Sequence, residues 1–177
     1  MTEALDRHPL AHQFNQLTPE SVLDAVDGSL GIRCTGRFFV LNSYENRVYS
    51  LELEDDTWVV GKFYRPGRWT KEAILDEHRF LAELEDVEIP AVCPKKLSNG
   101  ETISETNQIL FSLFPRVGGR EPQELSDEQA EVLGRLIARI HNIGANADAP
   151  HRLRITPETY GRNNLDFLLE HDVIPEE

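Results

Sequence analysis

Lys62 and Glu77 are the residues of this sequence whose types and spacing point most directly to chemistry. Lys62 lies in an apolar, strand-like run at 58–64, and Glu77 lies near the middle of the apolar stripe of a helical run at 70–84. A buried charge without a partner costs several kcal/mol, so we expect the two side chains to form one buried ion pair. A strand lysine held by a glutamate of the next helix is suited to binding the α- and β-phosphates of ATP. The alternative is an edge-strand lysine and a solvent-facing glutamate.

The periodicity of the chain predicts the elements that position this pair. Alternating or apolar runs bounded by turn residues predict strands at 38–41, 49–53, 58–64, around Ile103 and at 108–114. Capping residues and apolar stripes predict helices at 18–28, 70–84, 126–144 and 165–169. The first of these helices begins at Thr18-Pro19, and Gly28 is the residue expected to close it.

This order of elements predicts an α+β fold with a boundary near Gly118. About five antiparallel strands and one helix would form a protein-kinase-like small lobe at 1–117, and 118–177 would hold the hinge crossing and the first helices of a large lobe. In such a lobe the lysine lies on the third strand and its glutamate on the next helix, as expected here. Period 2 places Val60 beside Lys62, where it could cover an adenine ring, and turns Val59 and Phe63 toward the Glu77 helix.

Two connecting segments are candidates for contacts with a nucleotide. The turn at 42–47 lies where a phosphate-covering loop would be, but it has no glycine and is not a G-x-G-x-x-G loop. Its polar side chains and backbone N–H groups could meet phosphate oxygens, and an ordinary hairpin turn is the alternative. The segment 114–119 lies where a hinge would offer backbone groups to adenine, and a plain connector is its alternative. Arg47, Arg65, Arg68 and Lys71 could hold phosphates or a phosphorylated partner, and a solvated basic face is the alternative.

The composition limits the classes of partner. The chain has 177 residues, a formal net charge of −13 and a sequence pI near 4.9, which argues against a nucleic-acid or anionic-membrane surface. No run approaches a membrane span, and the first residues lack the apolar stretch of a signal peptide. Cys34 and Cys93 are expected to be reduced thiols in the cytoplasm, and no histidine has metal-ligand spacing.

Several stretches of the chain resemble one family. Residues 41–49, 62–70, 77–78, 114–120 and 133–141 are similar to the bacterial stress response kinase A family. These proteins are Ser/Thr protein kinases with an aminoglycoside-phosphotransferase-like fold. The combination of Asn-Ser-Tyr-Glu-Asn-Arg-Val with Lys-Phe-Tyr-Arg-Pro is the most specific part, and the resemblance spans nearly the whole chain in order.

The resemblance implies the site residues, the cofactors and the partner. Lys62 and Glu77 would be the catalytic residues that the chain contributes. The residues expected to bind ATP are Ser43, Tyr44, Glu45, Asn46, Val48, Val60, Lys62, Leu113, Phe114 and Arg116. Mg²⁺ would take its ligands from outside this chain. The substrate would be a protein with Ser or Thr hydroxyls, and the parent kinase would be a monomer.

The resemblance stops short of the family's catalytic machinery. A His-Gly-Asp loop, an asparagine shortly after it and a later metal-binding aspartate are not found in these residues, and His171-Asp172-Val173 is the nearest imitation. The 177 residues alone are therefore expected not to transfer phosphate. Two alternatives remain open: a standalone truncated pseudokinase that binds nucleotide weakly or acts as an interaction module, and a fragment of a phosphotransferase for choline, homoserine or sugars.

Overall fold

The computed structural model of the chain describes residues 14, 16–119 and 122–171. Its strands are β1 (Cys34–Leu41), β2 (Arg47–Leu53), β3 (Trp58–Phe63), β4 (Ser104–Thr106) and β5 (Ile109–Pro115). Its helices are α1 (Pro19–Leu30), α2 (Lys71–Asp86), α3 (Asp127–Gly144), the π-helical turn η3 (Glu158–Arg162) and α4 (Asn163–Glu170). The predicted α+β class is confirmed, and Lys62 lies on the third strand.

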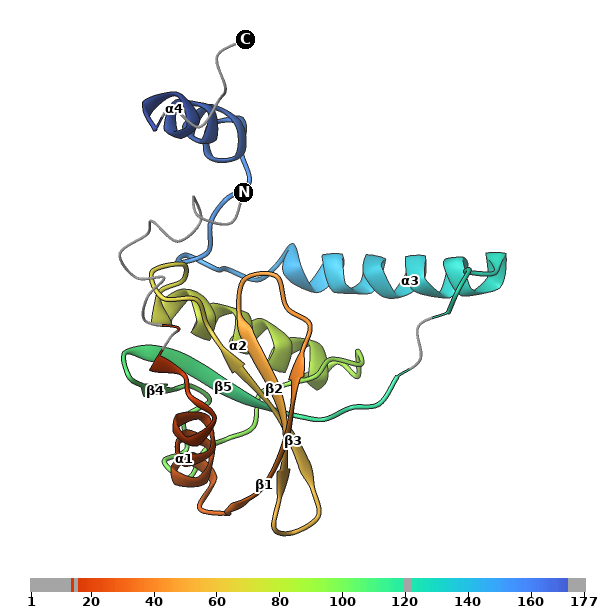
Figure 1. Cartoon of the computed structure of the whole chain (residues 1–177). Coiled ribbons are helices and arrows are strands. Elements are labelled where there is room, and N and C mark those ends of the chain that lie inside the picture. The colour runs from red at the N-terminus through yellow and green to blue at the C-terminus, as the bar shows by residue number, and fades with distance from the viewer. Residues whose placement is uncertain (1–13, 15, 120–121, 172–177) are drawn as a thin grey trace.

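The strands form one antiparallel sheet of five, in the order β1-β2-β3-β5-β4. The chain leaves β3 through α2 and returns as β4 and β5, so β5 lies beside β3 at the centre of the sheet (Figure 1). The register places Val48 of β2 and Ser112 of β5 on either side of Lys62. Residues paired in this way share one face of the sheet, so Val48 and Ser112 lie on the same face as Lys62.

Different helices cover the two faces of the sheet. On one face, Val59 and Phe63 pack with Val22 and Val26 of α1 in the main core. On the other face, Tyr64 packs with Ile74 of α2 in a smaller cluster. The expectation that Val59 and Phe63 point toward the Glu77 helix is therefore wrong. Alternation along a strand tells which residues share a face, but it does not tell which helix covers that face.

The helix starts follow the predicted capping chemistry. Thr18 and Thr70 accept hydrogen bonds from the backbone N–H groups of Ser21 and Ala73, and a capping box begins α3. The predicted end of the first helix at Gly28 is wrong, because α1 continues to Leu30 and closes at Gly31. Gly31 has φ 68°, the left-handed conformation of a helix C-cap, whereas a glycine inside a helix costs only about 1 kcal/mol.

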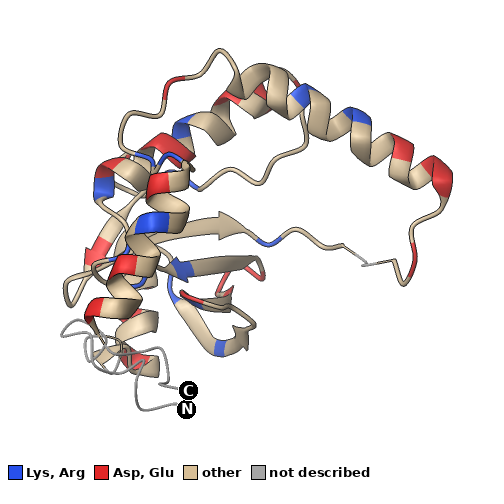
Figure 2. Cartoon of the chain, turned by 90° about the horizontal axis from the view of Figure 1, so that it is seen from above, with Lys and Arg blue, Asp and Glu red and all other residues tan. Residues whose placement is uncertain are grey.

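After β5 the described elements are all helical. Helix α3 lies above α2 and extends beyond its end, and α4 lies apart from the sheet (Figure 1). Acidic residues begin α3, and both signs of charge follow along it (Figure 2). None of the described helices is both long and apolar enough to cross a membrane. The boundary between 117 and 118 falls in the extended segment before α3 and remains a prediction.

Candidate functional site

An apolar cavity with one charged end lies where β5 leaves the sheet. Its volume is about 380 Å³, within the range of small-molecule sites. It is lined by Val48, Val60, Lys62, Glu77, Leu81, Val92, Phe114, Pro115 and Val117. Strands β2 and β3 supply one wall, α2 supplies another, and the end of β5 supplies a third. Five of the residues predicted from the sequence therefore meet at one cavity: Val48, Val60, Lys62, Glu77 and Phe114.

The charged end of the cavity is the predicted ion pair. The Lys62 Nζ atom lies 3.2 Å from Glu77 Oε1. The side chains are 28% and 30% exposed, so the expectation of a buried pair is wrong. Helix α2 instead turns Asp76 and His78 inward, beside Ile74 and Leu84. A partly exposed pair next to an apolar cavity can still receive an anion, because the ammonium remains open to solvent on one side.

The aromatic ring of Tyr64 is a second neighbour of the Lys62 ammonium. The Lys62 ammonium lies 4.9 Å from the centroid of the Tyr64 ring, close enough for a cation–π contact. Burial raises the pKa of Tyr64, so its hydroxyl stays protonated at neutral pH. The lysine is thus placed by a carboxylate and by a neutral ring.

A buried polar network lies behind the ion pair, and the sequence analysis did not find it. His78 Nδ1 lies 2.8 Å from the Thr102 hydroxyl, and its Nε2 lies 3.4 Å from both Tyr64 Oη and Ser112 Oγ. Burial lowers the pKa of His78, which keeps the ring neutral at neutral pH. The network ties α2 to β5, so it fixes the distance between the two walls of the cavity. The sequence feature that could have predicted the burial of His78 is its position four residues after Ile74, which places both residues on the same face of the helix.

The turn between β1 and β2 is held by its own side chains. The Asn46 backbone N–H donates to Ser43 Oγ at 3.2 Å, and the Arg65 backbone N–H donates to Asn46 Oδ1 at 3.2 Å. Glu45 forms an ion pair with Arg68 at 3.3 Å, while Tyr44 is fully exposed. The four predicted residues at 43–46 do not line the cavity, although these contacts anchor the turn to the chain just after β3.

The predicted hinge residues divide between the cavity and other surfaces. Phe114 lines the cavity, but the Leu113 side chain is fully buried in the main core. The reason is alternation, since Leu113 pairs with Gly61 on the face that α1 covers. Arg116 donates its backbone N–H to Trp58 O at 3.4 Å, and its guanidinium lies 4.8 Å from the Trp58 ring centroid. Leu113 and Arg116 therefore contribute no side chain to the cavity.

The described residues include no group of three or more His, Cys, Asp or Glu side chains placed to hold a metal ion. Asp172 and Val173 of the His-Asp-Val stretch lie outside the described residues. The cavity itself offers apolar walls for a flat ring and one ammonium for an anion. Such a cavity can receive a flat apolar ring that carries an anionic group.

Comparison with known proteins identifies the family. A model of the phosphotransferase enzyme family matches residues 39–173. The chain belongs to this phosphotransferase family. Stress response kinase A of Escherichia coli (strain K12) is 39% identical over 150 residues, which cover 85% of this chain and 45% of that protein. Serine/threonine protein kinase RdoA of Salmonella typhimurium (strain LT2) is 40% identical over 134 residues, covering 76% of this chain and 40% of that protein.

These relatives confirm the resemblance to stress response kinase A, and the chain spans less than half of their length. Solved structures of other kinases share the fold. An amicoumacin kinase, hAmiN, covers 100% of this chain and 57% of its own length with a TM-score of 0.66 and 14% identity. A microcompartment-associated aminopropanol kinase covers 85% of this chain and 49% of its own, with a TM-score of 0.67 and 18% identity. At such identities these structures indicate the architecture alone.

Proposed function

We propose that this chain is the ATP-binding part of a Ser/Thr protein kinase related to stress response kinase A. The whole kinase would transfer the γ-phosphoryl group of ATP to protein hydroxyls. The observation that carries the proposal is the Lys62–Glu77 pair, 3.2 Å apart, at the charged end of an apolar cavity beside the end of β5. In kinase-like folds a lysine on this strand binds the nucleotide phosphates, and a glutamate on the next helix holds the lysine in place.

The dimensions and chemistry of the cavity support this assignment. Val48 and Val60 form an apolar surface on the sheet, and Leu81 faces them from α2. An adenine ring between these walls would reach the backbone of Phe114 and Pro115, and its phosphates would extend toward Lys62. The turn at 43–46 would then cover the phosphates through the backbone N–H groups of its first residues, since the Asn46 N–H already donates to Ser43 Oγ and the side chains of Glu45 and Asn46 have partners of their own.

The protein substrate is the finer part of the proposal. It is supported by the names of the two curated relatives and by the family-specific stretches at 41–49 and 62–70. The family's His-Gly-Asp loop has no counterpart in these 177 residues, so we expect this chain to bind nucleotide without transferring phosphate. Mg²⁺ ligands would lie outside these residues. A cytoplasmic location is part of the same proposal, because Cys34 and Cys93 are both free thiols.

Nucleotide binding is the direct test. Isothermal titration with AMP-PNP, an ATP analogue that resists hydrolysis, would be made on the wild-type chain and on Lys62→Ala. We expect binding by the wild type and a loss of at least about tenfold in affinity for Lys62→Ala, the cost of removing one charge-assisted phosphate contact. Lys71→Ala is the matched control, because Lys71 is an exposed lysine at the start of α2 that does not line the cavity. Equal affinity of Lys62→Ala and wild type would overturn the assignment.

An interaction module remains the second candidate, and one observation favours it. Helices α3 and α4 expose apolar side chains, including Val132, Leu133, Ile137, Phe167 and Leu169. Apolar surface of this kind on a folded chain marks a site for association. Light scattering after size-exclusion chromatography would test it. Self-association without AMP-PNP binding would favour the interaction module, and a monomer that binds AMP-PNP would favour the nucleotide-binding assignment.

A further inference from the structure

The Glu77 carboxylate has a second cationic partner on the side away from Lys62. Arg152 Nη1 lies 3.1 Å from Glu77 Oε2, whereas Lys62 Nζ lies 3.2 Å from Glu77 Oε1. Arg152 follows α3 and is 75 residues from Glu77 in the sequence. Each oxygen of the carboxylate thus has its own cation, so the two cations do not compete for the same lone pairs.

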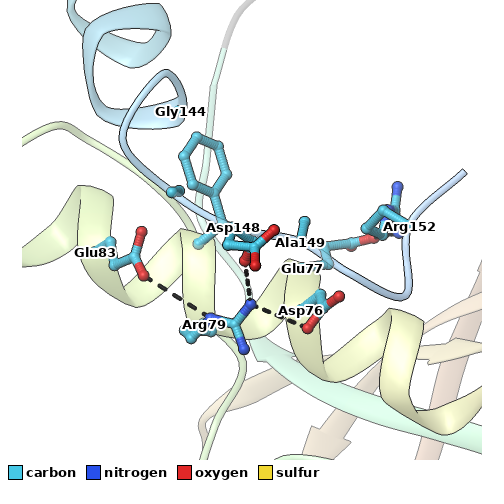
Figure 3. A pocket seen from close by; sticks show the side chains of 10 residues that line it. Asp76, Glu77, Arg79, Glu83, Gly144, Asp148, Ala149 and Arg152 are labelled. Atoms are coloured by element: carbon cyan, nitrogen blue, oxygen red, sulfur yellow. Dashed lines mark hydrogen bonds and ion pairs between the residues drawn. The ribbon is translucent and has the colours of Figure 1, made fainter. Parts of the chain in front are cut away.

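The loop that carries Arg152, residues 148–152, is fastened to α2 through the neighbouring carboxylate. The His151 backbone N–H donates to Asp76 Oδ2 at 2.9 Å, and Arg79 Nη2 donates to Asp76 Oδ1 at 3.0 Å and also to the Asp148 carbonyl. Figure 3 shows Asp76, Arg79 and Asp148 converging between α2 and the loop. The Asp76 side chain is 2% exposed. Burial raises the pKa of Asp76, but the bonds from His151 and the charge of Arg79 outweigh it and lower that pKa overall.

A tryptophan ring lies against the guanidinium of the arginine. The Arg152 guanidinium lies 4.4 Å from the centroid of the Trp69 ring, and the Arg68 guanidinium lies 5.2 Å from the same centroid. A stacked, planar guanidinium loses less freedom for each hydrogen bond it makes than a lysine would. Arg152 therefore offers Glu77 a preorganised donor.

The Lys62–Glu77 pair by itself holds the two side chains in place only weakly, because both are partly exposed. An ion pair between exposed side chains contributes about 0.2–1 kcal/mol, since two long side chains must be ordered to form it. Because the contact with Arg152 already orders the Glu77 side chain, less side-chain entropy is lost when Glu77 pairs with Lys62. The rotamer of Glu77, and with it the position of Lys62, then depends on a loop distant in the sequence.

We propose that Arg152 is a positioning residue for the nucleotide site, holding Glu77 in the orientation that pairs with Lys62. Through Arg152, the 148–152 loop links the helical part of the chain to the phosphate-binding lysine. The inference rests on the proposed function only in taking Lys62 as a phosphate ligand. It assigns Arg152 no contact with the nucleotide.

A double-mutant cycle on AMP-PNP affinity tests the proposal. Arg152→Ala and Glu77→Gln are each expected to raise the Kd about twofold to fivefold, the most that one exposed pair contributes. If both act through the same contact, the double variant binds no more weakly than the weaker single variant. Arg152→Lys is expected to recover part of the loss. Arg154→Ala, which removes an exposed arginine from the next residues of the chain, is expected to bind as wild type. Additive losses, or a wild-type Kd for Arg152→Ala, would overturn the proposal.

A second measurement requires no nucleotide. Acetic anhydride acetylates free amines, and mass spectrometry can compare Lys62 with Lys71 in the same sample. Arg152→Ala and Glu77→Gln should both increase the relative labelling of Lys62, because both free its ammonium from the carboxylate. Slower labelling in Arg152→Ala would instead show that Arg152 competes with Lys62 for Glu77. If the wild type fails to bind AMP-PNP, the proposed function fails, and the labelling still decides the role of Arg152.

Discussion

The Lys62 ammonium lies 3.2 Å from the Glu77 carboxylate, and both side chains remain partly exposed, at 28% and 30%. This relationship separates the pair's contribution to stability from its contribution to binding. Pairs in such surroundings are worth about 1 kcal/mol or less, whereas removing one partner of a buried pair costs about 3–5 kcal/mol. The pair is therefore suited to holding a ligand more than to holding the fold.

Glu77→Ala removes the partner of both Lys62 and Arg152, and it is expected to lower the free energy of unfolding by no more than about 2 kcal/mol, about 1 kcal/mol for each partly exposed pair. Urea denaturation followed by far-UV circular dichroism would measure it. Asp76→Ala is the comparison on the same helix, because Asp76 is buried and accepts hydrogen bonds from His151 and Arg79. We expect Asp76→Ala to lose more stability than Glu77→Ala. The reverse order would mean that Glu77 is the structural carboxylate of α2.

The ion pair could be predicted from the sequence because it depends on local patterns. Period 2 and the turn residues place Lys62 on the third strand, and helical period 3.6 places Glu77 on the next helix. The identity of the buried polar residues could not be predicted in this way. Asp76, Glu77 and His78 are consecutive, and an apolar stripe at least about 100° wide leaves their relative burial undecided. Their burial depends on Thr102, Ser112 and the 148–152 loop, which are distant in the sequence.

The same limit explains the errors on the sheet. The alternation of Val59, Val60 and Lys62 is readable from the sequence, and Lys62 and Val60 do share the cavity. Which helix covers which face is determined by tertiary packing, here that of Val22 and Val26 against Val59 and Phe63. Leu113 was predicted as a site residue although it lies beside Phe114, and neighbours on a strand point to opposite faces.

The neutral, buried His78 should make the fold sensitive to acid. Burial lowers the pKa of His78 in the folded state below its usual value, so the unfolded chain binds the proton more readily. Stability is then fully present above about pH 6.5 and falls as pH drops below the unfolded pKa, by at most about 1.4 kcal/mol per pH unit. The loss stops once pH is below the folded pKa.

His78→Gln is the variant that isolates this effect, since glutamine can retain a hydrogen bond but does not titrate in this range. Unfolding free energies measured between pH 5 and 8 should show a shallower pH dependence for His78→Gln than for wild type. Identical slopes would mean that another group controls the acid sensitivity.

Gly61 should not tolerate a side chain. A Cβ atom at this position on β3 would lie 3.1 Å from Phe63 Cε2 and 3.4 Å from Leu51 Cδ1. Phe63 is fully buried and stacks on Phe111 with centroids 5.0 Å apart, so it has little room to move. Gly61→Ala is expected to destabilise the fold by about 1–3 kcal/mol through overpacking.

Gly134→Ala provides the control for Gly61→Ala. A Cβ atom at Gly134 meets nothing within 4 Å, and the residue lies inside α3. We expect it to raise stability by about 0.5–1 kcal/mol, because alanine loses less backbone freedom in a helix. Thermal melts of both variants would reveal opposite shifts. A rise in melting temperature for Gly61→Ala would show that the core under β3 can relax.

Cys34 should be the less reactive of the two thiols. Burial raises the pKa of Cys34 to about 12, and the hydrogen bond and charge of Asp27 add to the effect. Burial also raises the pKa of Cys93, with smaller contributions from Glu85 and Asp86. Alkylation requires the thiolate, and at pH 8 a pKa of about 12 leaves about one thiolate in ten thousand Cys34 thiols.

We expect iodoacetamide to modify Cys93 first, as read by peptide mass spectrometry. Asp27→Asn should accelerate labelling at Cys34 alone, because it removes the nearby negative charge while its amide oxygen can still accept from the Cys34 backbone N–H. Faster modification of Cys34 in the wild type would contradict the electrostatic account of this corner of the fold.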